Sequence, residues 1–233
     1  MKRFISALIT LSLIFSLSVP AFASEPNSQS TLTPTIISDN VTERIVAVDD
    51  AIATYDKISN TVTVTQNGAS ATISLAPIQD KALAAAPYAN SKTTIRSETV
   101  WMHEYEYYKT SNTSFFYCID IPSLNINPNE WCDPITVADN GSLAATSAKK
   151  FANLIDAAKD NEVKLVTYGG AIAVSAAVGF ISKNMKFTKA AYISALAAAG
   201  ITVTSNVAGI AGDYINNILN ARDEYYAVQG YLA

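Results

Sequence analysis

Residues that carry out acid–base, nucleophilic and metal chemistry are scarce in this chain, which has one histidine and two cysteines among 233 residues. A zinc site needs three or four such ligands, and His103 has no second histidine or free cysteine at a ligand spacing. His103 and Glu106 also point to opposite faces of a strand, because side chains alternate along a strand and their separation is odd. We therefore interpret His103 as an exposed or packed strand residue.

Catalytic motifs are also missing. The sequence contains no Gly-rich phosphate loop, no G-x-S-x-G and no H-E-x-x-H. Two carboxylate pairs, Asp49-Asp50 and Glu104 with Glu106, resemble those of glycosidases, but such pairs occur on any acidic surface. The sequence predicts a protein that is not an enzyme and that uses no cofactor or metal.

Charge is sparse and uneven. Charged residues make up 15% of the chain. Residues 24–140 contain 6 basic and 14 acidic side chains, whereas residues 141–233 contain 8 basic and 6 acidic ones. Binding to nucleic acid depends on clustered Lys and Arg, so this balance argues against nucleic acid as a partner.

The N-terminus has the pattern of an export signal. Lys2 and Arg3 precede an apolar run at residues 4–19, and Ala21-Phe22-Ala23 forms an A-x-A cleavage site. The run is short and contains several serines, so cleavage is favoured over a retained membrane anchor. We expect a secreted, extracellular protein whose mature chain has 210 residues and a net charge of −6.

The rest of the chain divides into three parts. Residues 24–42 are rich in Ser, Thr, Pro and Asn and lack an apolar period, which predicts a flexible leader or a pro-segment. Residues 43–140 are rich in β-prone runs, and residues 141–233 have helical patterns. The predicted fold class is α+β, with N-terminal antiparallel β-hairpins followed by a C-terminal α-helical bundle that contains an apolar helical hairpin.

The clearest β-signal is a hairpin. Residues 61–65 and 71–75 alternate apolar and polar side chains, and Asn67-Gly68 between them suits a type I′ turn. A shorter β-prone run precedes the hairpin at residues 44–48. A second β-region is expected to have one arm from Ser97 to Tyr108 and another at residues 115–118.

Aromatic residues are concentrated in this second β-region. Tyr and Trp bury a ring while their polar tip stays in water, so a cluster of them suits a ligand platform or a membrane-interface anchor. Ordinary packing of a sheet is the simpler alternative. The candidate surface residues are Trp101, Tyr105, Tyr107, Tyr108 and Trp131.

Both cysteines, Cys118 and Cys132, lie in the exported part of the chain. Export leads to an oxidising compartment, which favours a disulfide between them. A disulfide closing this loop would constrain the unfolded chain by roughly 3 kcal/mol. Two free thiols are the alternative, because sequence alone does not establish the geometry that a disulfide needs.

An amphipathic helix is predicted from about residue 142 to residue 160. Phe151, Leu154, Ile155 and Ala158 have the i, i+3, i+4, i+7 spacing of one helix face. Ser142 or Asp139 is the expected N-cap.

The most unusual feature is the segment Leu165–Gly212, which we call the apolar segment. It has 18 uncharged residues from Leu165 to Ser182 and 23 from Ala190 to Gly212, joined by a lysine-rich link. Each run is long enough to cross a bilayer, but its apolar side chains favour insertion by only roughly 2 to 4 kcal/mol. The segment is therefore either buried core or a conditionally inserting hairpin. Its candidate functional residues are Tyr168, Gly169, Gly170, Gly179, Lys183, Lys186, Lys189, Gly200, Gly209 and Gly212.

This layout resembles the large secreted bacteriocins of the geobacillin type. The similarity is in the export signal, the Ser/Thr/Asn-rich leader, the β-rich middle and the helical C-terminal half, with Thr167-Tyr168-Gly169-Gly170-Ala171 and Ala208-Gly209-Ile210-Ala211-Gly212. The resemblance implies an antimicrobial protein that acts on related Gram-positive bacteria, and it supplies no catalytic residue.

Two functions follow as hypotheses. The first is a secreted antimicrobial protein whose apolar segment leaves its packed state and enters a target membrane. The second is a secreted binding or structural module of the cell envelope, in which that segment is always core. The expected partner is a target-cell membrane or an envelope component, and the sequence does not specify an oligomeric state.

Overall fold

The structure is a computed structural model that describes residues 32–76, 94–99, 103–109, 115–120 and 135–233. Within these residues nine strands precede three helices, so the predicted α+β class is confirmed. The predicted signal peptide, with its cleavage site at Ala21 and Ala23, lies outside the described residues and stays a prediction.

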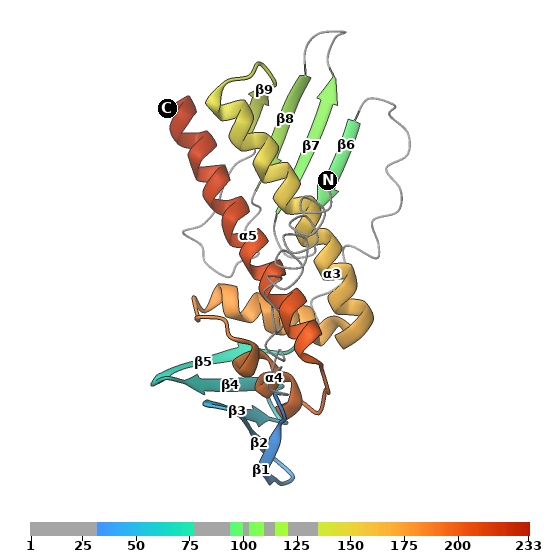
Figure 1. The fold of residues 1–233 in the computed structure, drawn as a ribbon, viewed down its shortest axis with the longest axis vertical. Helices are drawn as coiled ribbons and strands as arrows, with labels where there is room; N and C mark the ends of the chain where they lie inside the picture. The colour runs from blue at the N-terminus through green and yellow to red at the C-terminus, as the bar shows by residue number, and fades with distance from the viewer. Residues whose placement is uncertain (1–31, 77–93, 100–102, 110–114, 121–134) are drawn as a thin grey trace, which may run out of the picture. The chain divides into compact units, whose positions relative to one another are not determined.

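The first sheet is an antiparallel meander in which each strand pairs with its neighbour in sequence (Figure 1). Its strands are β1 (Thr35–Asp39), β2 (Glu43–Val48), β3 (Ala51–Asp56), β4 (Thr61–Gln66) and β5 (Ala69–Ser74). The predicted hairpin is confirmed as β4–β5, with Val62 paired to Ile73. Asn67 and Gly68 have φ angles of 52° and 77°, as the predicted turn requires.

Two strands of this sheet differ from the sequence prediction. β1 lies inside residues 24–42, so the last part of the predicted flexible leader is an ordered edge strand paired with β2. β1 is mostly exposed and has no apolar face, which explains why its pattern gave no signal. β3 was not predicted, because its buried positions Ala51 and Ala53 are small side chains of low β-propensity.

The second sheet has the order β6-β7-β8-β9 and is also antiparallel. Its strands are β6 (Thr94–Glu98), β7 (Glu104–Lys109), β8 (Phe115–Asp120) and β9 (Ile135–Ala138). The predicted single arm from Ser97 to Tyr108 is wrong, since it contains two strands. Thr99 N–H donates to His103 O at 2.8 Å, and His103 N–H donates to Thr99 Oγ1 at 3.1 Å, so the chain reverses between them.

The three helices are α3 (Leu143–Ser182), α4 (Lys189–Ala198) and α5 (Ser205–Leu232). Each begins at a hydroxyl N-cap that accepts a backbone N–H, and the three caps are Ser142, Thr188 and Thr204. The prediction of Ser142 as a cap is confirmed. Phe151, Ile155 and Ala158 are fully buried, so the predicted amphipathic face is also confirmed.

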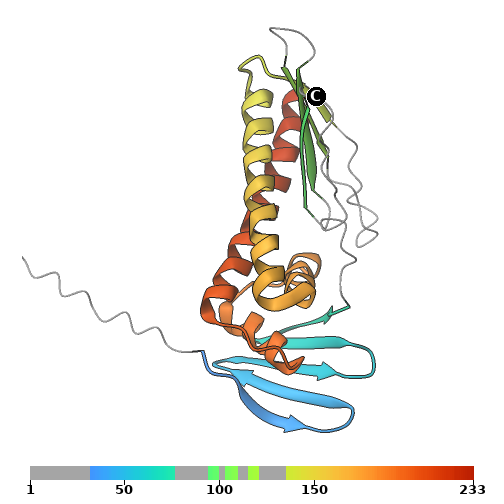
Figure 2. The ribbon, with the colours of Figure 1, turned by 90° about the vertical axis from the view of Figure 1, so that its right-hand side faces the viewer.

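Helices cover one face of each sheet. The first part of α3 packs against β6–β9 and the antiparallel α5 lies beside it, whereas α4 packs against β2, β3 and β4 (Figures 1 and 2). Val46, Val64 and Ile73 on the covered face of the five-stranded sheet are buried, as are Tyr105 and Val137 in the four-stranded sheet.

Candidate functional site

The apolar segment does not form the predicted hairpin of two long helices. Gly170 has φ 69° and ψ 179°, which interrupts α3 and separates residues 165–169 from a helical piece at 171–182. Gly200, with φ 84°, lies between α4 and α5. Glycine adopts these positive φ angles without steric cost, so both breaks are built into the sequence. The segment therefore contributes four separate helical pieces.

Among the described residues, α3 alone is long and apolar enough to be a candidate membrane span. This is weak evidence, because 56% of its most apolar window is buried inside the structure, as in the core helix of a soluble protein. After the break at Gly170, the uninterrupted helix contains only residues 171–182. At 1.5 Å per residue this piece is about 18 Å long, shorter than a hydrocarbon core of about 30 Å.

The pieces of the apolar segment are held together by an aromatic cluster. Phe180, Phe187 and Tyr192 have ring centroids 5.6 to 6.3 Å apart, and Phe180 and Tyr192 are almost completely buried. Tyr192 Oη donates to Ala173 O at 2.8 Å, which joins α4 to residues 171–182. Burial raises the pKa of Tyr192 well above its ordinary value, so the phenol stays protonated.

Small residues allow the segment to approach its neighbours closely. A Cβ on Gly179 would lie 1.9 Å from Ile73 Cγ2, so only glycine fits against strand β5. A Cβ on Gly212 would lie 2.9 Å from Phe187 Cε1, and one on Gly169 would lie 2.7 Å from Ala173 Cβ.

The lysine-rich link is a fixed and exposed loop at residues 183–189. Asn184 N–H donates to Ile181 O and Met185 N–H donates to Phe180 O, both at 3.0 Å, which is a Schellman end of α3 with Asn184 in the left-handed region. Lys183, Lys186 and Lys189 are exposed. A Cβ on Gly209 of α5 would lie 3.7 Å from Lys189 Nζ.

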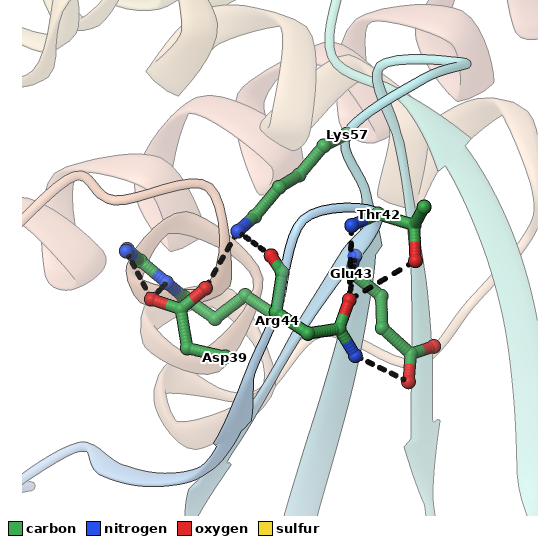
Figure 3. A network of polar contacts seen from close by, with 6 residues as sticks. Asp39, Thr42, Glu43, Arg44 and Lys57 are labelled. Carbon is green, nitrogen blue, oxygen red and sulfur yellow. Dashed lines mark hydrogen bonds and ion pairs between the residues drawn. The ribbon is translucent and has the colours of Figure 1, made fainter.

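A polar network on the five-stranded sheet lies next to the α4–α5 connection (Figure 3). Asp39 accepts from Arg44 Nη2 at 2.7 Å and from Lys57 Nζ at 2.6 Å. Hydrogen bonds from Arg44 and then Lys57 lower the pKa of Asp39 to about 2. Arg44 Nη1 lies 3.2 Å from the position of a Cβ on Gly200, so this network also borders one break of the apolar segment.

The predicted aromatic surface is wrong for Tyr105, which is buried against α3. Tyr105 Oη donates to Asp156 Oδ2 at 2.8 Å, and burial followed by the Asp156 carboxylate raises the pKa of Tyr105. Tyr107 is half-buried, with its ring centroid 4.6 Å from that of Tyr117. Tyr105 and Tyr107 share the face that packs on the helices, so sheet packing accounts for both. Tyr108 belongs to β7, while Trp101 and Trp131 lie outside the described residues.

Two buried ionisable groups near the helix pair were not predicted as functional. Glu162 is 2% exposed, and its Oε1 accepts a hydrogen bond of 2.7 Å from Tyr214 Oη of α5. Its position was a usable signal, because Glu162 follows Ile155 and Ala158 on the apolar face of α3. His103 is 1% exposed, and its ring centroid lies 6.3 Å from that of Phe151. His103 is packed, which was one of the two alternatives, but it lies directly before strand β7 and not within a strand.

Metal and redox chemistry find little support in the part of the chain that the structure describes. No group of three or more His, Cys, Asp or Glu side chains there could hold a metal ion. Cys118 belongs to β8 and Cys132 lies outside the described residues, so their disulfide stays a prediction. Of the carboxylate pair Asp49-Asp50, Asp50 Oδ1 accepts a hydrogen bond of 2.7 Å from Gln66 Nε2 and thus has a structural contact.

Comparison of the chain with models of protein families, with curated proteins and with solved structures found no match.

Proposed function

We propose that this protein is a secreted antimicrobial protein of the bacteriocin kind, which acts on related Gram-positive bacteria. In this proposal the apolar segment leaves the five-stranded sheet and enters the target membrane. The observation that carries the proposal is the burial of long uncharged runs as short helical pieces: residues 173–181 and 190–196 are buried throughout. A soluble protein that delivers an apolar sequence to a membrane has to cover that sequence first.

The breaks in the segment suit a stored form. Gly170 and Gly200 separate the pieces, and joining them into longer helices requires a change of backbone angles at those two residues. The insertion free energy of roughly 2 to 4 kcal/mol for each run favours entry only modestly. Membrane entry is therefore expected to be conditional on release from the sheet.

A second candidate function is a binding or structural module of the cell envelope with no membrane activity. It is favoured by a specific observation, the packing of α4 and residues 171–182 as ordinary core. Gly179 fits against Ile73 with no room for a side chain, which is typical of a permanent interface.

Growth inhibition of related Gram-positive strains, measured beside dye release from liposomes, separates the two functions. The informative variant is Tyr168→Asp with Thr202→Asp, because both positions lie in the uncharged runs and are exposed in the folded protein. Each aspartate makes the free energy of membrane insertion less favourable by about 2.5–3.5 kcal/mol. An exposed substitution changes the free energy of unfolding by only about 0.5 kcal/mol. We expect the variant to fold normally and to lose dye release.

The matched control is Asn153→Asp with Asn216→Asp, which adds the same charge at exposed helix positions outside the apolar segment. The control is expected to keep both activities. If the unmodified protein neither inhibits growth nor releases dye, the antimicrobial proposal is wrong and the envelope module remains. Inhibition without dye release would indicate a target other than the bilayer.

A further inference from the structure

The apolar segment has a one-sided charge distribution. Its 48 residues contain no aspartate or glutamate, and its only charged side chains are Lys183, Lys186 and Lys189. All three fall within seven consecutive residues and are exposed. In a chain with an excess of acidic groups, the exposed charge of this segment is therefore purely positive.

Within the described residues these lysines form no ion pair. None of the three has a carboxylate within 4.0 Å in the described part of the chain, whereas four other basic side chains do: Arg44, Lys57, Lys149 and Lys150. Two carboxylates are connected to the loop through other residues. Asp50 accepts a hydrogen bond from Gln66, which in turn accepts one from Thr188 of the loop. Asp213 follows Gly212, against which Phe187 of the loop packs. Because no described carboxylate lies within 4.0 Å of the three lysines, their charges are available to an external anion.

The loop is rigid enough to present these charges together. The Schellman bonds fix its first turn, and Thr188 Oγ1 donates to Gln66 Oε1 at 2.8 Å at its end. Between them the Phe187 ring packs against Gly212, Phe180 and Tyr192. Because the backbone is already ordered, the conformational entropy lost by the loop on binding is that of the lysine side chains.

We propose that the loop at residues 183–189 is the surface through which the protein docks on a bilayer of anionic phospholipid. This inference rests on the proposed membrane function and deepens it by naming the lipid class and the contact. Phospholipid fits because the loop joins the two uncharged runs, residues 165–182 and 190–212, so docking brings both runs to the bilayer. A basic residue near an anionic surface strengthens binding by about fivefold, so three contribute on the order of 100-fold.

Binding is tested by flotation of the full exported protein with vesicles of phosphatidylcholine, with and without phosphatidylglycerol. The test variant is Lys183→Gln with Lys186→Gln and Lys189→Gln. The control variant, Lys150→Gln with Lys159→Gln and Lys164→Gln, changes net charge equally on the first part of α3. Circular dichroism verifies that both variants are folded.

We expect the test variant to bind phosphatidylglycerol vesicles on the order of 100-fold more weakly, and the control to change binding less than about fivefold. Salt of about 1 M, where the Debye length is about 3 Å, is expected to remove the difference. Equal weakening by the two variants, or equal binding to both vesicle types, would overturn the inference.

Flotation and dye release separate this inference from the proposed function. If the unmodified protein docks through the lysines but releases no dye, the docking surface is supported and the insertion proposal fails. If both variants bind and release dye equally well, insertion is supported and the docking surface is overturned.

Discussion

The two sheets are covered by helices of different chemistry. Residues 171–182 and α4 contain no acidic side chain. Hydrogen bonds join their region to strand β4 and to the residues just after β5, from Thr188 to Gln66 and from Ser175 to Ala76 O. The helix pair on the four-stranded sheet buries ionisable groups instead, with His103 beneath it and Glu162 within it.

Because of this difference, we expect one region to control release of the apolar segment and the other to control the pH dependence of stability. An apolar interface with few polar contacts can separate without breaking ion pairs. Release of the apolar segment is therefore expected at the five-stranded sheet. A buried histidine with a lowered pKa responds to protons, so a pH dependence of stability is expected at the helix pair. The following variants test that division.

The largest effect is expected from Phe180→Ala. Phe180 is 1% exposed and belongs to the aromatic cluster, and loss of its ring costs about 3–5 kcal/mol of unfolding free energy. Because the cluster holds the apolar segment, we also expect faster dye release. Urea denaturation gives the first quantity and liposome leakage the second, and Phe180→Leu provides a milder step in case the alanine variant does not fold.

Phe151→Ala is the counterpart in the helix pair, where Phe151 is fully buried. We expect a similar loss of stability, about 3–5 kcal/mol, without faster leakage. If both variants speed leakage equally, general loosening rather than local release is responsible, and the assignment of release to one sheet is wrong.

A smaller, pH-dependent effect is expected at His103. Burial, and then the charge of Arg222, lowers the pKa of His103 to about 3 from an ordinary 6.5. The unfolded chain therefore takes up the proton first. The contribution of neutral His103 to the free energy of unfolding is complete above pH 6.5 and decreases as the pH falls toward 3. At pH 5 it is lower by about 2 kcal/mol.

The measurement is urea denaturation between pH 7 and pH 5 for the unmodified protein and for His103→Phe, each compared with its own value at pH 7. Carboxylates titrate alike in both proteins, so the difference between their pH profiles isolates His103. Parallel profiles would show that the histidine is not held neutral by burial.

Two further variants remove single buried hydroxyls, and the smallest effect of all is expected from Tyr192→Phe. Tyr214→Phe removes a hydrogen bond to the Glu162 carboxyl group, which costs about 1–3 kcal/mol, whereas Tyr192→Phe removes one to a backbone carbonyl and costs about 1 kcal/mol. Thermal or urea denaturation measures both. A larger loss for Tyr192→Phe would reverse the comparison between the two regions.

Local patterns in the sequence predicted several elements correctly. The alternation in β4 and β5, the Asn67-Gly68 turn, the Ser142 cap and the apolar face of Phe151, Ile155 and Ala158 all depend on neighbours within a few residues. Such interactions are specified by short-range geometry, so they can be inferred without knowledge of the fold.

Elements that depend on distant partners were missed. Edge strand β1 is ordered by pairing with β2, and Tyr105 is turned inward by α3, including its hydrogen bond to Asp156. Gly179 fits against Ile73, which is far away in the sequence, so no local pattern predicted this contact.

The sequence by itself determined that Leu165–Gly212 carries no acidic group and has three clustered lysines. Only the tertiary structure decided that Gly170 bends α3, that α4 covers the five-stranded sheet and that the long helix pair is α3 with α5. The physical reason is that an apolar helix is compatible with any apolar surface of suitable shape. Long-range packing, which a local pattern does not encode, selects among those surfaces.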